Sequence, residues 1–426
     1  MRETINVVSI GGGNGQSQVA QALIKSWMTW LRVAFITSAF DDDTDAVRTS
    51  TGRLRAKGNP GYYGDLGLVM GAICSACAIR DWLPEKLSMR FESGIAEGQT
   101  FGDLFSEAFR GNFREGMQGQ YRHKAIKTIS QIMGFDDIED ATIRSILIEL
   151  LEFPLEADDF RRHSGRNLLL FALEQIVRRR GLKISMALEA MHVFYGIPDS
   201  YRVIPVSWES GTLKATTKSG KLITGQSLID YRDRDPSFDG IDRIDTKTIT
   251  IEPSILPARE AVRAIRKADV IIITCGSPMS NVFAPFMMGN KKLKRELRKR
   301  VKEASVPIVY IMNLVTEVGI TRFKDKVYKA TDVVELVREA IGCYPDYVIC
   351  DTTPISREVR EQLLPERRIE IGDFGGRSTL IRAKISMIVR SEDPRIPPKL
   401  IHDPEKLGRV FAESEIFSKT LVGAHS

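Results

Sequence analysis

The chain has 426 residues, enough for one large or two moderate domains, and its 43% hydrophobic and 27% charged residues are ordinary for a globular protein. A net charge of +6 suits anionic ligands without requiring nucleic acid, which we do not expect as a partner. Because no basic leader precedes an apolar core and no apolar run approaches the ~20 residues of a membrane span, we expect a cytoplasmic protein without a membrane span. The five cysteines lack metal-ligand spacing, so we expect small buried thiols in a reducing compartment.

A glycine turn joins the first strand-like run, residues 5–10, to an amphipathic stretch at residues 16–25. The turn consists of Gly11, Gly12, Gly13, Asn14 and Gly15. Glycine permits positive φ and lets backbone N–H groups approach an anion, and a helix N-terminus adds partial positive charge. The turn lacks the Lys-Ser/Thr of a Walker A loop and does not fit Gly-x-Gly-x-x-Gly. It therefore predicts either a phosphate cradle or a tight strand–helix connection.

Acidic residues follow the second strand-like run, residues 31–38, beginning with Asp41 and Asp42. Ligands of doubly wound sheets bind beyond the carboxyl ends of the strands, where carboxylates hold sugar hydroxyls or magnesium. The alternative is a solvated acidic loop. Arg53 lies in a segment of hydroxyls and guanidiniums suited to phosphate oxygens, and Asp65 ends a loop before the apolar run at residues 66–78.

Several motifs resemble, in the same order, those of the superfamily that joins the 2-phospho-L-lactate transferases with the gluconeogenesis factors. The matching segments are residues 11–15, 50–55, 60–65, 163–169, 203–206, 225–229, 268–277, 310–319 and 402–407. The resemblance covers most of residues 5–410, interrupted by one long insertion. The chain departs from the family pattern at Asn14, where the family has threonine, in extra residues at 43–49, and at residues 275–281, which lack a second glycine.

The resemblance implies two alternative functions. The gluconeogenesis factors bind a UDP-sugar without an established reaction, and the segments at residues 163–167 and 402–406 resemble that branch more closely. This implies binding of a nucleotide diphosphate conjugate by a metabolic or cell-envelope regulator. The alternative is a magnesium-dependent transferase that moves a phospho-acyl group from a guanosine diphosphate carrier to a deazaflavin alcohol. No permanently held redox cofactor is expected.

The residues expected at the ligand follow from these motifs. The predicted ligand contacts are Gly11, Gly12, Gly13, Asn14, Gly15, Asp41, Asp42, Arg53, Asn167, Gly276, Ser277, Asn281 and Asn313. Asp41 and Asp65 are the candidate magnesium ligands, and Asp65 is the candidate catalytic carboxylate. His163 is either a general base or a partner of a backbone group. The amides of Asn281 and Asn313 either read a nucleobase edge or form turns.

The pattern predicts a Rossmann-like α/β fold with a largely parallel sheet, an antiparallel edge hairpin and an inserted helical subdomain. The strand-like runs are residues 5–10, 31–38, 202–208, 213–217, 221–225, 268–274, 306–312 and 346–350. We expect a nucleotide-binding core at residues 1–90 and 163–410 and a tail at 411–426. The helical insertion at residues 91–162, with its clearest apolar face at 141–151, is either a lid or acceptor subdomain, or else a dimer surface or an insertion without a function of its own. We expect a homodimer.

Residues 291–300 form a basic run with seven lysines and arginines. Leu293 and Leu297 are one helical turn apart within it, so we interpret the run as an amphipathic surface helix with a solvated basic face rather than as a nucleic-acid patch.

Overall fold

The computed structural model describes residues 4–26, 28–38, 63–78, 100–102, 130–131, 133–154, 165–209, 211–231, 243–317, 320–323, 326–362, 368–390 and 398–417. The predicted roles of Asp41, Asp42, Arg53 and His163 concern residues outside these ranges, as does most of the segment at 91–162.

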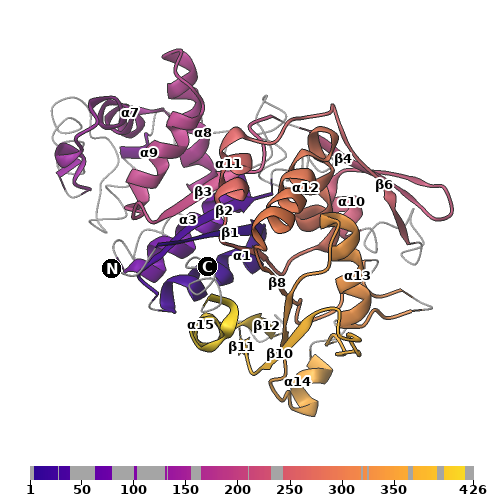
Figure 1. The fold of residues 1–426 in the computed structure, drawn as a ribbon. Coiled ribbons are helices and arrows are strands. Elements are labelled where there is room, and N and C mark those ends of the chain that lie inside the picture. The colour runs from indigo at the N-terminus through magenta and orange to yellow at the C-terminus, as the bar shows by residue number, and fades with distance from the viewer. Residues whose placement is uncertain are drawn as a thin grey trace.

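Seven parallel strands form the main sheet, in the order β10-β9-β8-β7-β1-β2-β3 (Figure 1). Their bounds are β1 (Ile5–Gly11), β2 (Leu31–Thr37), β3 (Tyr201–Pro205), β7 (Val270–Ile273), β8 (Ile308–Ile311), β9 (Tyr347–Asp351) and β10 (Thr379–Ala383). From β1 the chain adds strands first in one direction and then, beginning at β7, in the other. This is the doubly wound order of Rossmann-like folds, and it confirms the predicted fold class.

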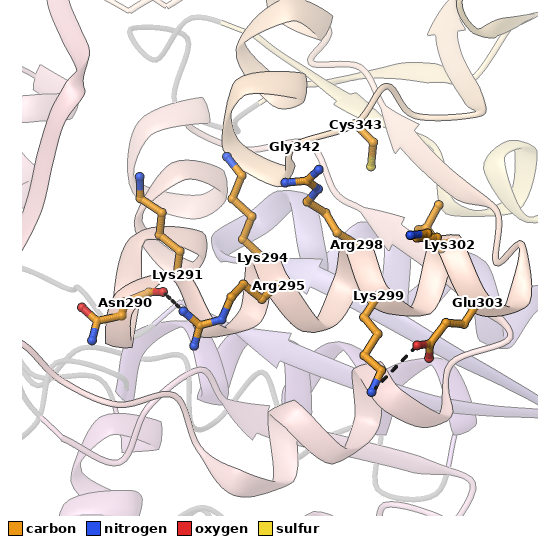
Figure 2. Close-up of a pocket in the computed structure, with 11 residues that line it drawn as sticks. Asn290, Lys291, Lys294, Arg295, Arg298, Lys299, Lys302, Glu303, Gly342 and Cys343 are labelled. Carbon is orange, nitrogen blue, oxygen red and sulfur yellow. Dashed lines mark hydrogen bonds and ion pairs between the residues drawn. The ribbon is translucent and has the colours of Figure 1, made fainter.

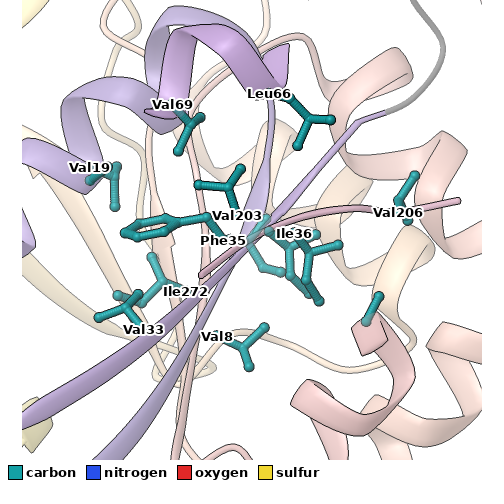
Figure 3. Packing of buried hydrophobic residues seen from close by; sticks show 14 of the residues in the cluster. Val8, Val19, Val33, Phe35, Ile36, Leu66, Val69, Val203, Val206 and Ile272 are labelled. Carbon is teal, nitrogen blue, oxygen red and sulfur yellow. The ribbon is translucent and has the colours of Figure 1, made fainter. Parts of the chain in front are cut away.

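The strands form because β-branched runs are buried on both faces of the sheet. Val7 of β1 pairs with Val33 of β2 and with Val270 of β7. The sequences of β7 (VIII) and β8 (IVYI) are buried throughout. Figure 3 shows how strand residues such as Phe35 and Ile272 pack with helix residues such as Val19.

Helices cover the sheet in two groups, on opposite sides in Figure 1. Helix α1 packs against α3 and α15, whereas α12 packs against α11 and α13. The right-handed crossover of parallel strands accounts for this division, because the two halves of the sheet are wound in opposite directions from β1. The bounds are α1 (Gly13–Lys25), α3 (Tyr63–Cys77), α11 (Arg259–Lys267), α12 (Ala284–Ala304), α13 (Ala330–Ile341) and α15 (Pro404–Glu413).

Two small antiparallel sheets lie outside the main sheet. One contains β4 (Thr212–Thr217), β5 (Leu222–Thr224) and β6 (Ile244–Glu252), and the other contains β11 (Ser386–Val389) and β12 (Lys399–His402). The predicted hairpin is therefore present, but it belongs to a separate sheet, and Tyr201–Pro205 is the parallel edge strand of the main sheet. The sequence pattern did not predict β6, β10, β11 or β12.

The described end of the insertion forms helix α7 (Ala141–Glu152), whose N-cap Asp140 accepts a hydrogen bond from the Thr142 N–H at 2.8 Å. The expected apolar face is buried, at Ile143, Ile146, Leu147, Leu150 and Leu151. This face packs against α8 (Gly165–Arg179) and α9 (Ser185–Tyr195). The end of the insertion is thus attached to the helices that follow it in the chain.

Shorter elements complete the described fold. They are η1 (Phe135–Asp137), α10 (Gln226–Tyr231), the π-helix η3 (Pro278–Phe283) and α14 (Arg357–Gln362). In the described ranges no helix combines the length and apolar character needed to cross a membrane. The tail boundary expected at residue 410 falls inside α15, and Phe411 and Phe417 are buried.

Two expectations about side chains can be checked directly. Leu293 and Leu297 are fully buried, which confirms the amphipathic helix. All five cysteines are free thiols, but burial holds only for Cys74, Cys275 and Cys350, because Cys77 and Cys343 are partly exposed.

Candidate functional site

The candidate site lies at the carboxyl edge of the main sheet, between β1 and β7, where the direction of strand addition reverses. Doubly wound sheets bind their ligands at such a point, because the loops after the two strands diverge and leave a crevice. Here the glycine turn follows β1, and residues 274–277 follow β7. The Thr274 N–H donates to the Ile10 carbonyl at 2.9 Å and so holds the two strand ends together.

Two of the predicted glycines are explained by close packing between these loops. A Cβ on Gly11 would overlap the Thr274 side chain, and a Cβ on Gly15 would overlap the backbone carbonyl of Cys275. Gly13 begins α1 at φ +59°, a conformation that favours glycine. The turn is therefore a tight strand–helix connection, and its role as a phosphate cradle stays a prediction.

Two polar side chains converge on Gly12, the N-cap of α1. A Cβ at Gly12 would overlap the carboxylate of Asp65, which stands in the first turn of α3, and would lie 2.7 Å from Asn281 Oδ1. Asn281 belongs to η3, which follows β7, and its residue is 9% exposed. Three segments far apart in the sequence thus meet at one backbone position, and the predicted roles of Gly12, Asp65 and Asn281 toward a ligand stay predictions.

The amide of Asn281 lies between Gly12 and Gly276. Its Oδ1 is buried and hydrogen-bonds to no atom in the described part of the chain. Gly276 leaves the space that this amide occupies, because a Cβ there would lie 2.7 Å from Asn281 Nδ2. A buried amide oxygen without a partner costs about 1–3 kcal/mol, so the position favours a hydrogen-bond donor from a ligand.

Asn313, another predicted ligand residue, holds the loop after β7. Its Oδ1 accepts from the Gly276 N–H at 3.2 Å and from the Tyr310 hydroxyl at 3.5 Å. Its Nδ2 donates to the Gly276 carbonyl at 2.8 Å and to Glu317 Oε1 at 3.2 Å. These four contacts use the whole hydrogen-bonding capacity of the amide, so its role here is to position Gly276. Direct contact between Asn313 and a ligand stays a prediction.

Sequence reasoning missed a buried pair that supports the same loops. His402 Nδ1 lies 3.4 Å from Cys275 Sγ, and His402 Nε2 lies 3.2 Å from the Met312 carbonyl. Burial lowers the pKa of His402 to about 4 and raises the pKa of the Cys275 thiol to about 12. The imidazole is therefore neutral, with Nε2–H donating to the carbonyl and Nδ1 accepting from the thiol. The signal was available, since His402 begins the closing motif at residues 402–407.

The other predicted residues lie around this centre. Ser277 is the N-cap of η3 and is partly exposed beside Gly276. Asn14 lies in the first turn of α1. Asn167 is buried in the first turn of α8, next to Arg166, which packs against Gly67 of α3. The structure thus connects the α8 segment to the helix that carries Asp65.

The described residues contain no group of three or more His, Cys, Asp and Glu side chains that could hold a metal ion by themselves. Asp65 is the carboxylate that the described chain places at the glycine turn. Mg²⁺ in phosphate sites is bound through one or two carboxylates together with phosphate oxygens, so a single carboxylate here fits that ion.

Fold and site together define a doubly wound α/β protein with polar side chains gathered at its topological switch point. The family model of the 2-phospho-L-lactate transferase CofD matches residues 7–372, and the chain belongs to that family.

The curated relatives described next are named gluconeogenesis factors. The chain is 26% identical over 223 residues to the gluconeogenesis factor of Listeria monocytogenes, covering 52% of this chain and 60% of the relative. It is 27% identical to the gluconeogenesis factor of Halalkalibacterium halodurans, and the match covers 53% of this chain and 66% of the relative. The match thus spans about three fifths of the Listeria protein. A crystal structure of a UPF0052 family member from Bacillus halodurans has the same fold, with a TM-score of 0.65 at 20% identity. The superposition covers 96% of this chain and 99% of that protein.

Proposed function

We propose that this protein binds a nucleotide diphosphate conjugate of the UDP-sugar type in the crevice between β1 and β7, as a gluconeogenesis-factor-like regulator. The convergence of Asp65 and Asn281 on Gly12 is the observation that carries this proposal. The diphosphate lies at the N-terminus of α1, where backbone N–H groups and the helix dipole favour an anion. The unpartnered Asn281 oxygen accepts a hydrogen bond from a hydroxyl or N–H of the ligand.

Magnesium resolves an electrostatic conflict in this arrangement. A diphosphate at the glycine turn stands beside the Asp65 carboxylate, and two anions this close repel each other. Mg²⁺ held by Asp65 and by phosphate oxygens would neutralise that repulsion. A ligand bound without the ion instead places sugar hydroxyls against Asp65, which then accepts their hydrogen bonds.

The match to the transferase family favours a second candidate function, a magnesium-dependent transfer of a phospho-acyl group from a guanosine diphosphate carrier to a deazaflavin alcohol. This reaction requires an acceptor pocket next to the diphosphate, and the segment at residues 91–162 is the candidate to supply it. Diphosphate cleavage requires magnesium, whereas binding of a sugar nucleotide alone does not.

The test is a ligand panel measured by thermal shift and calorimetry: UDP-N-acetylglucosamine, UDP-glucose, GDP, GTP and deazaflavin alcohol, each with and without Mg²⁺. A ligand at 100 times its dissociation constant stabilises the fold by about 2.7 kcal/mol, which a thermal shift detects. A response to UDP-sugars alone supports the regulator. A magnesium-dependent response to guanosine nucleotides together with deazaflavin alcohol supports the transferase. Absence of a shift with every nucleotide refutes both.

Two variants test whether Asp65 holds the magnesium ion. In D65N, we expect the magnesium-dependent part of the affinity to be lost, because the carboxylate that holds the ion is gone. Glu358 is an exposed carboxylate in the first turn of α14, so E358Q removes a comparable charge and helix-dipole interaction elsewhere and should bind like the wild type. If D65N keeps the wild-type response to Mg²⁺, the role proposed for Asp65 is wrong.

A further inference from the structure

Helix α12 carries a second concentration of charge, away from the candidate site. After the left-handed stretch at residues 289–291, cationic side chains recur along one side of the helix. They line a hollow of about 840 Å³ together with Gly342 and Cys343, which follow α13 (Figure 2). Residues 342–346 lead into β9, so this part of the hollow is at the amino edge of the main sheet, opposite the edge that carries the glycine turn.

The hollow contains far more positive than negative charge. Its cationic side chains are those of Lys291, Lys294, Arg295, Arg298, Lys299 and Lys302, and its one carboxylate is that of Glu303. Glu303 lies 3.9 Å from Lys299, and in the described part of the chain no carboxylate forms an ion pair with Arg298 or Lys302. Most of these side chains are exposed, and in Figure 2 those of Lys294 and Arg298 point to the same side of α12, toward Gly342 and Cys343.

Backbone carbonyls fix two of the cations. Lys294 donates to the Glu339 backbone carbonyl, and Arg295 donates to the Asn290 carbonyl at 2.6 Å. Gly342 admits two of the side chains, because a Cβ there would lie 2.8 Å from both Arg298 Cδ and Lys294 Cε. Burial lowers the pKa of Lys294, and repulsion by Lys291, Arg298 and Arg338 lowers it further. The arrangement is therefore one that a polyanion would stabilise.

We propose that this hollow is a binding site for a small polyphosphorylated anion, distinct from the candidate nucleotide site. Guanidinium and ammonium groups are the side chains that bind phosphate oxygens most strongly. From Lys294 to Lys302 they extend over about 12 Å of helix, which matches a chain of linked phosphates better than a single one. The volume lies within the roughly 300–1,000 Å³ of small-molecule sites. None of the lining residues is aromatic, so recognition rests on phosphate rather than on base stacking.

The experiment titrates the full chain with inorganic tripolyphosphate by calorimetry at 50 mM NaCl, next to orthophosphate and a 20-nucleotide RNA. The R298Q/K302Q variant removes two cations from the hollow. R263Q/K267Q removes two exposed cations from α11 and is the matched control. We expect at least tenfold weaker tripolyphosphate binding in R298Q/K302Q and less than a twofold change in the control. Raising NaCl to 300 mM should weaken wild-type binding strongly, because exposed charges are screened.

A second measurement separates this proposal from a folding defect. Since Arg298 and Lys302 repel their neighbours in the free protein, the melting temperature of R298Q/K302Q without ligand should equal or exceed that of the wild type. Equal tripolyphosphate affinity in the two variants, or no binding by the wild type, overturns the proposal. RNA binding at least tenfold tighter than tripolyphosphate binding, and lost in R298Q/K302Q, overturns it in favour of a nucleic-acid surface.

Discussion

His402 should make the stability of the protein depend on pH between about 7.5 and 5, which lies mostly above the range where carboxylates titrate. Burial lowers its pKa to about 4, against 6.5 in the unfolded chain. The unfolded state therefore binds the proton first as the pH falls, and the folded state is progressively disfavoured. At pH 5 the difference amounts to about 2 kcal/mol, and it reaches about 3 kcal/mol below pH 4.

The assay is urea unfolding of the wild type and of H402Q at pH 7.5 and at pH 5.0. The substitution also removes contacts to Cys275 and Met312, so H402Q should be less stable at both pH values. The informative quantity is the loss of unfolding free energy between the two pH values within each protein. We expect this loss to be about 2 kcal/mol larger in the wild type than in H402Q.

A second buried histidine serves as an internal comparison. His192 donates from Nδ1 to the Leu188 carbonyl at 2.8 Å and accepts the Val203 N–H at Nε2 at 3.0 Å, and burial lowers its pKa to about 4. H192Q should therefore reduce the pH dependence by a similar amount. The chain has five histidines, so NMR can follow each imidazole directly. An identical pH dependence in H402Q and the wild type, or a His402 resonance that titrates near pH 6.5, would refute the reasoning.

Two further substitutions test the architecture of the crevice. G15A should destabilise the protein by about 3 kcal/mol or more, because its Cβ overlaps the Cys275 carbonyl, whereas G181A, at φ +63° with open space around it, should cost only about 1 kcal/mol in the same denaturation assay. N313D should lower the free energy of unfolding by about 2–4 kcal/mol at pH 7.5, because its carboxylate faces the Gly276 carbonyl and Glu317. Protonation of the carboxylate restores a hydrogen-bond donor, so the loss of stability should be smaller at pH 5. A loss that does not depend on pH would contradict this account.

The strands that could be predicted are those whose buried side chains form a recognisable pattern in the local sequence. β1, β2, β7 and β8 are short β-branched runs with buried side chains, so periodicity and composition identify them. β10 has the sequence TLIRA with no fully buried residue, and β11 exposes Met387, Ile388 and Val389. Strands of this kind depend on the partner they pair with, and a single sequence does not reveal that partner.

The candidate site was predictable to a similar extent. Gly12 and Asn281 follow strand-like runs and Asp65 ends a loop, which was enough to expect them at one edge of the sheet. Their contact with a ligand stays a prediction. The sequence could not predict that the Asn313 amide is fully hydrogen-bonded within the protein, because this depends on a contact with Gly276, 37 residues earlier in the chain. The His402–Cys275 contact spans 127 residues, so it forms only when β12 folds back against the loop after β7.

The central position of β1 has a consequence for how the protein is made. On one side β1 pairs with β2, which follows within a few tens of residues, but on the other side it pairs with β7, and the Asn6 N–H bonds to Asp269, 263 residues later. At roughly 5–20 residues per second, a ribosome takes about 13–53 s to synthesise that interval. Throughout that time one edge of this central strand has no partner in the chain, and an open strand edge is a template for unwanted pairing. The glycine turn can therefore take its final form only late in synthesis, when the second half of the sheet has emerged.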